Sequence, residues 1–323
     1  MTGIRVIRPG LMDTVQDAGR FGYYSLGVPD SGAADSLSLR AGNRILGNAD
    51  SDAAIELTLT GGVYEFDGDA DIALAGASMP AQVITARGQS RAVELATHTK
   101  VHAGESIRFA PATAGCRAYL CVRGGLDVPI VMGSRSTCLP GGFGGHEGRP
   151  LRAGDLLTIG NRAPGPLHLT TTDRAKAWQN ERFQKRPLRV IRTARTESLR
   201  AAFDKMKITT FRASPHSDRG GLRLAGAPIE AKQSGRMISE GVPLGAIQLP
   251  ESGEPIILLQ DRPTTGGYPI VACVIEADIP AAAQVRPGEN VSFEEITIDA
   301  ARRAARDQEA ALDRSIPPMI ALP

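Results

Sequence analysis

The segment VHAGESIRF, residues 101–109, recurs near the other end of the chain as VRPGENVSF, residues 285–293. The two copies share Val, Gly, Glu and Phe in register. Alternating residues on either side of a Gly-centred turn are typical of β-strands. A β unit that appears once in each half of the chain predicts a duplicated β fold.

Three further pairs of short segments occur in the same order in both halves. QDAGRFG, LGVPDSGAAD and LTLTGG in the first half are matched by SDRGGLR, EGVPLGAIQ and RPTTGG in the second. Chance likeness between Gly-rich turns is the alternative, because each match is short and the gaps differ. Four matches in one order favour duplication of a unit of roughly 150 residues. Closed sheets avoid open edges, so we expect two β-barrel lobes with a ligand-binding cleft between them.

The composition agrees with this architecture. The chain has 323 residues, of which 42% are hydrophobic and 22% charged, as in ordinary globular proteins. Its 36 Gly and 22 Pro predict many turns, and therefore a β-rich chain with few helices. Aromatic residues make up only 4%, so the core must rest on aliphatic side chains.

Several classes of protein are disfavoured by charge and hydropathy. A net charge of +2 without a dense Lys/Arg tract gives no sign of a nucleic-acid partner. The longest apolar runs, such as IVACVI at residues 270–275, fall far short of the roughly 20 residues of a membrane helix. The N-terminus lacks an apolar signal core, and the four cysteines form no C-x-x-C pair. We therefore expect a cytoplasmic protein with reduced thiols and no membrane partner.

Helical spacing is confined to three segments. Residues 31–48 place apolar side chains on one face, with Ser31 as candidate N-cap and Gly47–Asn48 as the stop. Residues 193–207 and 297–313 read as two further helices. The polar, basic run 173–187 is the best candidate for a linker. The predicted organisation is listed in chain order: a first lobe at 1–172, the linker at 173–187, a second lobe at 188–296, and a C-terminal helix and tail at 297–323.

Familiar catalytic motifs are missing from the sequence. There is no Gly-Lys-Ser/Thr phosphate loop, and GGFGGHEG at 141–148 carries Glu147 at the third glycine position of a dinucleotide fingerprint. His98 and His102 lie four apart but have no third ligand, so we expect no metal site. Ser134 lacks the G-x-S-x-G context of a serine nucleophile.

What remains is a set of Gly-rich turns that carry Asp and Arg. Arginine matches carboxylate or phosphate with a rigid fork of donors, and glycine lets backbone N–H groups approach an anion. The alternative is that Asp–Arg pairs brace tight turns, with glycine supplying positive φ. For any one turn taken alone, bracing is the favoured explanation. Five arginines at such turns favour function for the set.

Five segments resemble the signature blocks of a known family. They are TVQDAGRFGYYSLGVPDSGAAD, VRGGLDVPIVMGSRST, GGHEGRPLRAGDLL, SDRGGLRLAG and the long block GVPLGAIQLPESGEPIILLQDRPTTGGYPIVACVIEAD. The family is KipA, also called allophanate hydrolase subunit 2, the biotin-dependent carboxyltransferase family, and the C subunit of 5-oxoprolinase. The resemblance runs from about Ile4 to Phe293, nearly the whole chain.

The resemblance implies a mainly β fold of two cyclophilin-like barrels with a few short helices. It also implies a subunit of an ATP-dependent 5-oxoprolinase that is inactive alone and acts with KipI-like and LamB/YcsF-like partners on a small amide. ATP would be a co-substrate of the complex. One alternative is the carboxyltransferase component of a biotin-dependent, urea-carboxylase-like enzyme. Another is a regulatory protein that binds a KipI-like kinase inhibitor.

The family motifs also indicate which residues to test. The candidate catalytic residues are Asp17, Asp218 and Asp261. The candidate substrate- or anion-binding residues are Arg20, Arg135, Arg219, Gln248, Thr264, Thr265, Gly266, Gly267 and Tyr268. The segment QDRPTTGGYP, residues 260–269, is expected to form one wall of an anion site between the lobes, with its Thr and Gly groups pointing inward. Residues 220–222 read Gly-Gly-Leu where the family usually has Met-Gly-Tyr, which puts 5-oxoproline itself in question as the substrate.

Overall fold

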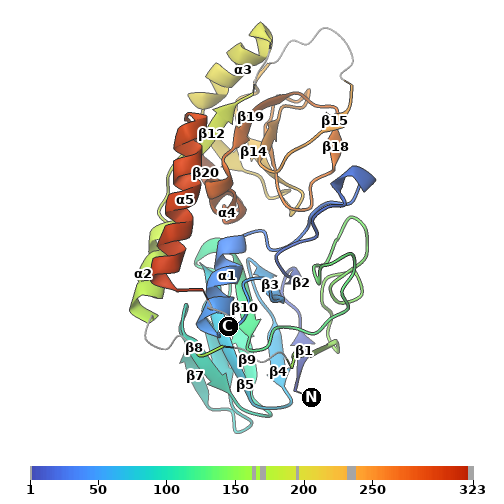
Figure 1. The fold of residues 1–323 in the computed structure, drawn as a ribbon, viewed down its shortest axis with the longest axis vertical. Coiled ribbons are helices and arrows are strands. Elements are labelled where there is room, and N and C mark those ends of the chain that lie inside the picture. Colours follow the sequence, from blue (N-terminus) through green and yellow to red (C-terminus); the bar gives the residue numbers. More distant parts are fainter. Residues whose placement is uncertain (1, 162–164, 168–171, 194–195, 231–237, 319–323) are drawn as a thin grey trace, which may run out of the picture. The chain divides into compact units, whose positions relative to one another are not determined.

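The computed structural model describes residues 2–161, 165–167, 172–193, 196–230 and 238–318. The chain folds into two compact units. Unit 1 contains residues 1–21, 31–183 and 310–323, and unit 2 contains residues 22–30 and 184–309. Figure 1 shows that both are built mainly of β-strands, as the sequence predicts.

Unit 1 contains two sheets whose paired strands run antiparallel. The first sheet, in spatial order, is β11 (Leu156–Thr158), β1 (Gly3–Arg8), β4 (Val63–Phe66), β9 (Ser106–Phe109), β6 (Ala81–Ile84) and β7 (Ser90–Val93). The second is β2 (Asp13–Gln16), β3 (Ala54–Thr58), β10 (Ala114–Val122), β5 (Ala70–Ser78) and β8 (His98–Val101). Both sheets contribute side chains to one buried cluster, among them Tyr64 and Leu120. The sheets therefore pack face to face.

Helix α1 (Ser36–Ile45) covers the other face of the second sheet. On β10, Leu120 joins the inter-sheet core while its neighbours Tyr119 and Cys121 pack with α1, as period-two alternation requires. The predicted cap, Ser31, does not cap this helix. Ser31 has a φ of 52°, and Asp35 instead accepts a hydrogen bond from the Ser38 N–H at 3.1 Å.

The polar run predicted as a linker contains a helix, α2 (Thr172–Arg182), which belongs to unit 1. Its single large apolar residue, Trp178, is 6% exposed and packs with α1 residues, while the Arg182 guanidinium lies 4.7 Å from the Trp178 ring. Arg182 also pairs with the buried Asp35 carboxylate at 2.7 Å. One tryptophan and a cation are enough to dock a helix whose other residues are polar.

Unit 2 is built around an eight-stranded sheet. Its spatial order is β20 (Asn290–Val291), β13 (Phe211–Ala213), β14 (Gly221–Ala225), β17 (Ile256–Leu258), β16 (Ala246–Gln248), β19 (Ile270–Val274), β12 (Leu188–Arg192) and β21 (Phe293–Glu295). The two edge strands, β20 and β21, are separated in the chain by Ser292 alone. The sheet must therefore curl until its edges meet, which gives a nearly closed barrel.

The remaining elements of unit 2 are short. They are η1 (Tyr24–Leu26), α3 (Glu197–Lys207), η3 (Glu276–Asp278), α4 (Ile279–Ala283) and the two-stranded ribbon of β15 (Glu240–Gly241) and β18 (Thr265–Gly266). In α3, Leu199, Phe203 and Met206 lie at helical spacing and are buried. The last helix, α5 (Ile298–Ser315), begins in unit 2 and ends in unit 1. The helices predicted near the middle and end of the chain are thus confirmed.

The repeated segments that suggested duplication adopt the same local geometry. The His102 N–H donates to the Glu105 carboxylate at 2.9 Å, and the Arg286 N–H donates to Glu289 at 3.0 Å. The turn at 152–155 repeats this bond at 2.8 Å, so a local rule alone can produce it. A second shared feature strengthens the case.

That second feature is an Asp turn. The Gly19 N–H donates to Asp17 at 2.8 Å, and the Gly220 N–H donates to Asp218 at 2.8 Å. Both turns come from matched segments, QDAGRFG and SDRGGLR. The two segments that match in sequence therefore also form the same hydrogen-bonded turn.

Candidate functional site

The segment 260–269 is partly a strand. Thr265 and Gly266 form β18, which pairs with Glu240–Gly241 to make the ribbon. At the base of the ribbon, the Val242 N–H donates to the Thr264 carbonyl at 3.1 Å. The segment contains two glycines and two prolines, yet its backbone is paired as a strand at Thr265–Gly266.

A cleft of about 690 Å³ lies in unit 2 beside this segment. Its lining comes from the β16–β17 sheet face with Gln248, the 218–224 turn and strand with Asp218, and the segment 260–269 with Pro263 and Tyr268, together with residues of 214–216 and of the loop 250–255. Thr264, Thr265, Gly266 and Gly267 do not line this cleft. Three of the predicted site residues, Asp218, Gln248 and Tyr268, are therefore brought together around one cleft.

Gln248 is the cleft residue that points most directly to a bound ligand. It ends strand β16, where it pairs with Ile256 on one side and Ile270 on the other. It is 4% exposed, and its Nε2 has no hydrogen-bond partner among the described residues. A buried amide donor without a partner is costly, so such a group points to a ligand.

Asp218 shapes the rim of the cleft. One of its carboxylate oxygens accepts hydrogen bonds from the Gly220 N–H at 2.8 Å and the Gly221 N–H at 3.0 Å. These bonds fix the turn that leads into β14. Of the three residues at 220–222, Gly220 and Gly221 line the cleft, whereas Leu222, at the position where the resemblance led us to expect Tyr, is 2% exposed and packs in the unit 2 core.

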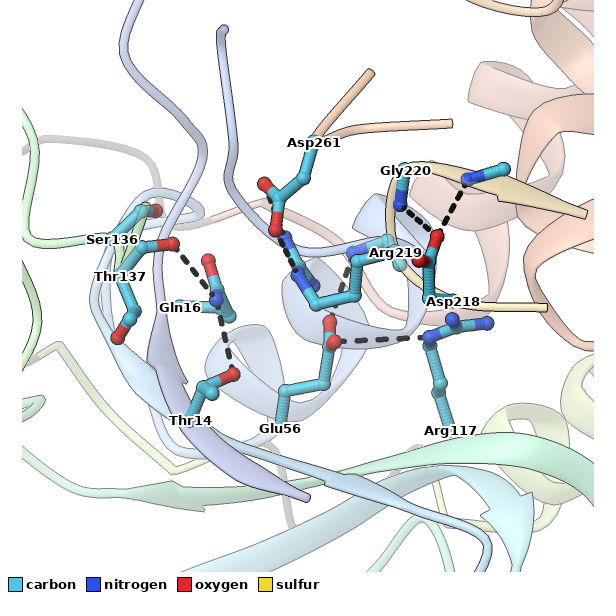
Figure 2. A network of polar contacts seen from close by, with 12 residues as sticks. Thr14, Gln16, Glu56, Arg117, Ser136, Thr137, Asp218, Arg219, Gly220 and Asp261 are labelled. Atoms are coloured by element: carbon cyan, nitrogen blue, oxygen red, sulfur yellow. Dashed lines mark hydrogen bonds and ion pairs between the residues drawn. The ribbon is translucent and has the colours of Figure 1, made fainter. Parts of the chain in front are cut away.

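Arg219 and Asp261 form an ion pair inside unit 2 (Figure 2). The Arg219 Nε donates to Asp261 Oδ2 at 2.8 Å, and the Asp261 N–H donates to the Arg219 carbonyl at 3.0 Å. Both residues are nearly buried, at 3% and 5% exposure. This pair ties the 218–221 turn to the 260–269 segment, which is the bracing alternative weighed for such turns.

Arg262 lies in the Asp- and Arg-bearing turn of segment 260–269 but was not among the candidate site residues. It is 4% exposed, donates from Nε to the Val242 carbonyl at 3.1 Å, and pairs through Nη2 with Asp30 at 3.0 Å. Its guanidinium lies 5.1 Å from the Tyr24 ring centre. The sequence signal that could have identified it is the YYSLGVPD block at residues 23–30, which contains its partners Tyr24 and Asp30.

Asp17 lies at the centre of a hydrogen-bond network in unit 1. Its carboxylate accepts from the Ser134 hydroxyl at 2.7 Å, from the Gly19 N–H at 2.8 Å and from the Ser136 hydroxyl and the Arg135 N–H. Each of these partners is a donor, so the carboxylate acts only as an acceptor here. The network holds the 134–136 loop in place, and the two serines in it were not predicted as site residues.

Arg20 is buried in the same region. It is fully inaccessible, donates to the Val131 and Ser136 carbonyls at 3.0 and 2.8 Å, and lies 4.8 Å from the Phe143 ring centre. Figure 2 shows the adjacent loop, where the Gln16 amide donates to the Thr137 carbonyl. Arg20 thus ties the backbone of Val131 to that of Ser136.

Arg135 lines a second, smaller cleft of about 380 Å³ that lies wholly in unit 1. Its Nη2 pairs with Asp127, also in the lining, at 2.9 Å. Asp17 contributes to the lining as well. The predicted residues of the first half therefore gather around the 134–136 loop, and those of the second half around the unit 2 cleft.

Metal binding and membrane insertion were both disfavoured by the sequence. In the described ranges, no group of three or more His, Cys, Asp or Glu side chains is placed to hold a metal ion. The same part of the chain has no helix long and apolar enough to cross a bilayer. None of the four cysteines, all within the described ranges, forms a disulfide, and burial raises the pKa of the Cys273 thiol although the nearby Arg262 opposes the shift.

Comparison with known proteins gives consistent matches. The family model for the carboxyltransferase domain, subdomains A and B, matches residues 26–295. The C subunit of 5-oxoprolinase from Haemophilus influenzae is 38% identical over 306 residues, which cover 93% of this chain and 94% of that protein. The protein of the same name from Escherichia coli is 35% identical over 312 residues, 95% of each.

A solved structure extends the likeness to the fold. The Kluyveromyces lactis urea carboxylase is 27% identical and superposes with a TM-score of 0.84. The match covers 99% of this chain but 30% of that longer one. Both curated and structural matches therefore span nearly all of the present sequence.

Proposed function

The chain belongs to the carboxyltransferase domain family, subdomains A and B, and we propose that it is the C subunit of a 5-oxoprolinase. The observation that carries this proposal is sequence identity over most of the chain. Two bacterial relatives of that name are 38% and 35% identical, and the matches cover 93% and 95% of this chain. The urea carboxylase is 27% identical.

The chemistry explains why a subunit of this kind needs partners. 5-Oxoproline is a lactam, and its carbonyl is a poor electrophile because the nitrogen lone pair is delocalised. ATP would activate it by transferring the γ-phosphoryl group to the carbonyl oxygen with release of ADP, and the negative charge on the transferring group calls for donors held in position before the reaction. The sequence has no phosphate-binding loop. We therefore assign ATP binding to a KipI-like or LamB/YcsF-like partner, and expect the chain alone to be inactive.

Gln248 is our candidate for the donor to the lactam carbonyl. Its Nε2 lacks a partner in the described part of the chain, it borders the unit 2 cleft, and it is nine-tenths buried. Asp218 and Tyr268 are proposed to contact the substrate from the rim. Arg219 and Asp261, which pair with one another, are proposed to hold the cleft in shape.

The test is reconstitution with the two partner proteins. Glutamate and ADP should appear together when all three are mixed with 5-oxoproline and ATP, and neither should appear when this chain is left out. Turnover that is the same without this chain would refute the proposal.

A matched pair of variants tests the assigned donor. Gln248→Leu should lower kcat/KM about 10- to 100-fold, the effect of losing one hydrogen bond to an otherwise unpaired oxygen. Gln308→Leu is the control, because that amide donates to the Ala277 carbonyl at 2.7 Å and does not line the cleft. Equal losses in the two variants would remove Gln248 from the site.

A carboxyltransferase role is the second candidate. The fold match to urea carboxylase favours it, and biotin would then carry the carboxyl group. This reading predicts a biotinylated partner and ATP use that depends on bicarbonate and urea. Lactam-dependent glutamate release in the absence of bicarbonate would decide against it.

A further inference from the structure

A segment from the first half of the sequence is built into unit 2. Residues 22–30, which include η1, belong to that unit although the chain on both sides of them belongs to unit 1. We call these nine residues the arm. The arm does not line the unit 2 cleft, so any effect it has on the cleft must be transmitted through other residues.

The arm contacts unit 2 at the base of the ribbon. The Tyr24 hydroxyl donates to the Val242 carbonyl, and the Arg262 Nε donates to the same carbonyl at 3.1 Å. Asp30 holds the other side of the Arg262 guanidinium at 3.0 Å, and the Tyr24 ring lies against it. The Val242 carbonyl oxygen thus accepts two hydrogen bonds. One donor, Tyr24, belongs to the arm, and the other, Arg262, is held by Asp30 and Tyr24 of the arm.

The ribbon starts at this point. Val242 donates its N–H to the Thr264 carbonyl, and the next pairs are Gly241 with Thr265 and Glu240 with Gly266. Fixing Val242 and Arg262 therefore fixes the register and position of both strands, since Arg262 lies just before β18 in the chain.

The ribbon in turn lies against the cleft residue Gln248. A Cβ built on Gly266 would be 2.5 Å from the Gln248 Nε2 and 3.0 Å from Val242 Cγ2. The ribbon backbone thus touches the amide whose donor has no partner among the described residues. Side chains flanking the ribbon, Pro263 and Tyr268, also form the cleft wall.

We propose that the arm positions the substrate-binding amide of Gln248, acting through Arg262 and the ribbon. Asp30 and Tyr24 are positioning residues in this scheme, and neither contacts the substrate. The inference rests on the proposed function for its kinetic test, but its structural test does not depend on any activity.

The structural test is hydrogen exchange of the full-length chain. Asp30→Asn removes the charge that holds Arg262 and keeps the shape, so amide exchange at Val242 and in the ribbon should rise about tenfold while the eight-stranded sheet is unaffected. The control is Glu295→Gln, which removes an ion pair with Lys207 at 3.0 Å on strand β21 of the same unit. Unchanged ribbon exchange in Asp30→Asn, or an equal rise in the control, would overturn the proposal.

The kinetic test uses the reconstituted complex with 5-oxoproline as the probe. Asp30→Asn should raise KM about 5- to 10-fold with kcat changed less than about twofold, and Asp30→Glu should restore most of the loss. In a Gln248→Leu background, Asp30→Asn should change KM less than about twofold, because the residue through which it acts is gone. The same fold-change in both backgrounds would overturn the inference while leaving the proposed function intact. A wild-type complex without lactam turnover would refute the proposed function, and the exchange experiment would still decide the inference.

Discussion

Asp13 and Asp261 are both buried carboxylates, but they have opposite surroundings. Asp261 faces the Arg219 guanidinium, so its charge is compensated. Asp13 receives hydrogen bonds from the Tyr64 hydroxyl and the Gly10 N–H, and its Oδ1 has no partner among the described residues. Burial outweighs these two bonds and raises the pKa of Asp13 to about 6. The residue type is the same in both cases, so the sequence alone does not show which of the two carboxylates is paired with a cation.

The raised pKa of Asp13 predicts a pH dependence of stability. The pKa in the unfolded chain is about 3.9, below the folded value, so the proton binds more tightly to the folded state. The contribution is therefore fully present below about pH 4 and is lost as the pH rises through 6, by about 3 kcal/mol at most. Asp13→Asn should abolish this change. Urea unfolding at about pH 4.5 and about pH 7 measures the difference in unfolding free energy between wild type and variant.

The exposed Asp69 provides the control for that measurement. In Asp69→Asn the difference in unfolding free energy between the two pH values should be the same as in wild type. The reason is that hydrogen bonds from the Ala103 N–H and from His102 lower the pKa of this exposed carboxylate, whereas burial raises that of Asp13. A wild-type-to-Asp13→Asn difference that is identical at both pH values would contradict the assignment.

At the scale of elements, the ribbon shows how short strands control a site. Each of its strands has only two residues, and both contain glycine, which has weak β propensity. Backbone pairing and the hydrogen bonds to the Val242 carbonyl hold them in place. Position 266 must be small because the Gln248 amide lies against it.

Gly266→Ala tests this arrangement. The added methyl would meet the flexible end of Gln248, so the amide must move, and kcat/KM for 5-oxoproline should fall about tenfold. Stability should fall by less than about 1.5 kcal/mol, because a flexible side chain can give way. Enzyme assays and thermal unfolding of the same preparations separate the two effects.

Gly241→Ala is a matched control on the facing strand. A Cβ there meets nothing within 4 Å among the described residues, and the residue pairs with Thr265 in the same ribbon. Wild-type kinetics are expected for it. If both alanine variants lost activity alike, general sensitivity of the ribbon would explain the result and Gln248 would not be involved.

At the scale of the whole molecule, two segments belong to a different unit from the residues that precede them in the chain. Residues 22–30 belong to unit 2, and residues 310–323 return to unit 1. Within unit 1, Leu312 and Ile316 are fully buried beside α1, and Arg44 pairs with Asp313 at 2.8 Å. The end of α5 is therefore part of the unit 1 core.

Leu312→Ala tests that role for the C-terminal helix. Removing this fully buried side chain should cost about 2–5 kcal/mol and should loosen unit 1, seen as faster hydrogen exchange in α1. Ile298→Ala on the same helix is 55% exposed and should change stability by less than about 0.5 kcal/mol. Loss of protection confined to unit 2 would contradict the assignment of this helix end.

The sequence by itself determined the mainly β class, the family, and the two helices predicted at 193–207 and 297–313, which the structure places at 197–207 and 298–315. These follow from local pattern: alternation, glycine turns and motif blocks are properties of neighbouring residues. It also identified Asp218, Gln248 and Tyr268, which meet at one cleft. The similar turns at Asp17 and Asp218 lie in segments that the sequence comparison had already matched, and the structure shows that both form the same hydrogen bond.

Only the tertiary structure decided what each charged residue contacts. Arg219 and Arg262 look alike in the sequence, yet one pairs with Asp261 and the other with Asp30, 42 and 232 residues away. It also decided that Trp178 anchors a helix in a polar run, and that the arm crosses into unit 2. Burial and long-range partners depend on how distant segments pack, and no local pattern encodes that packing.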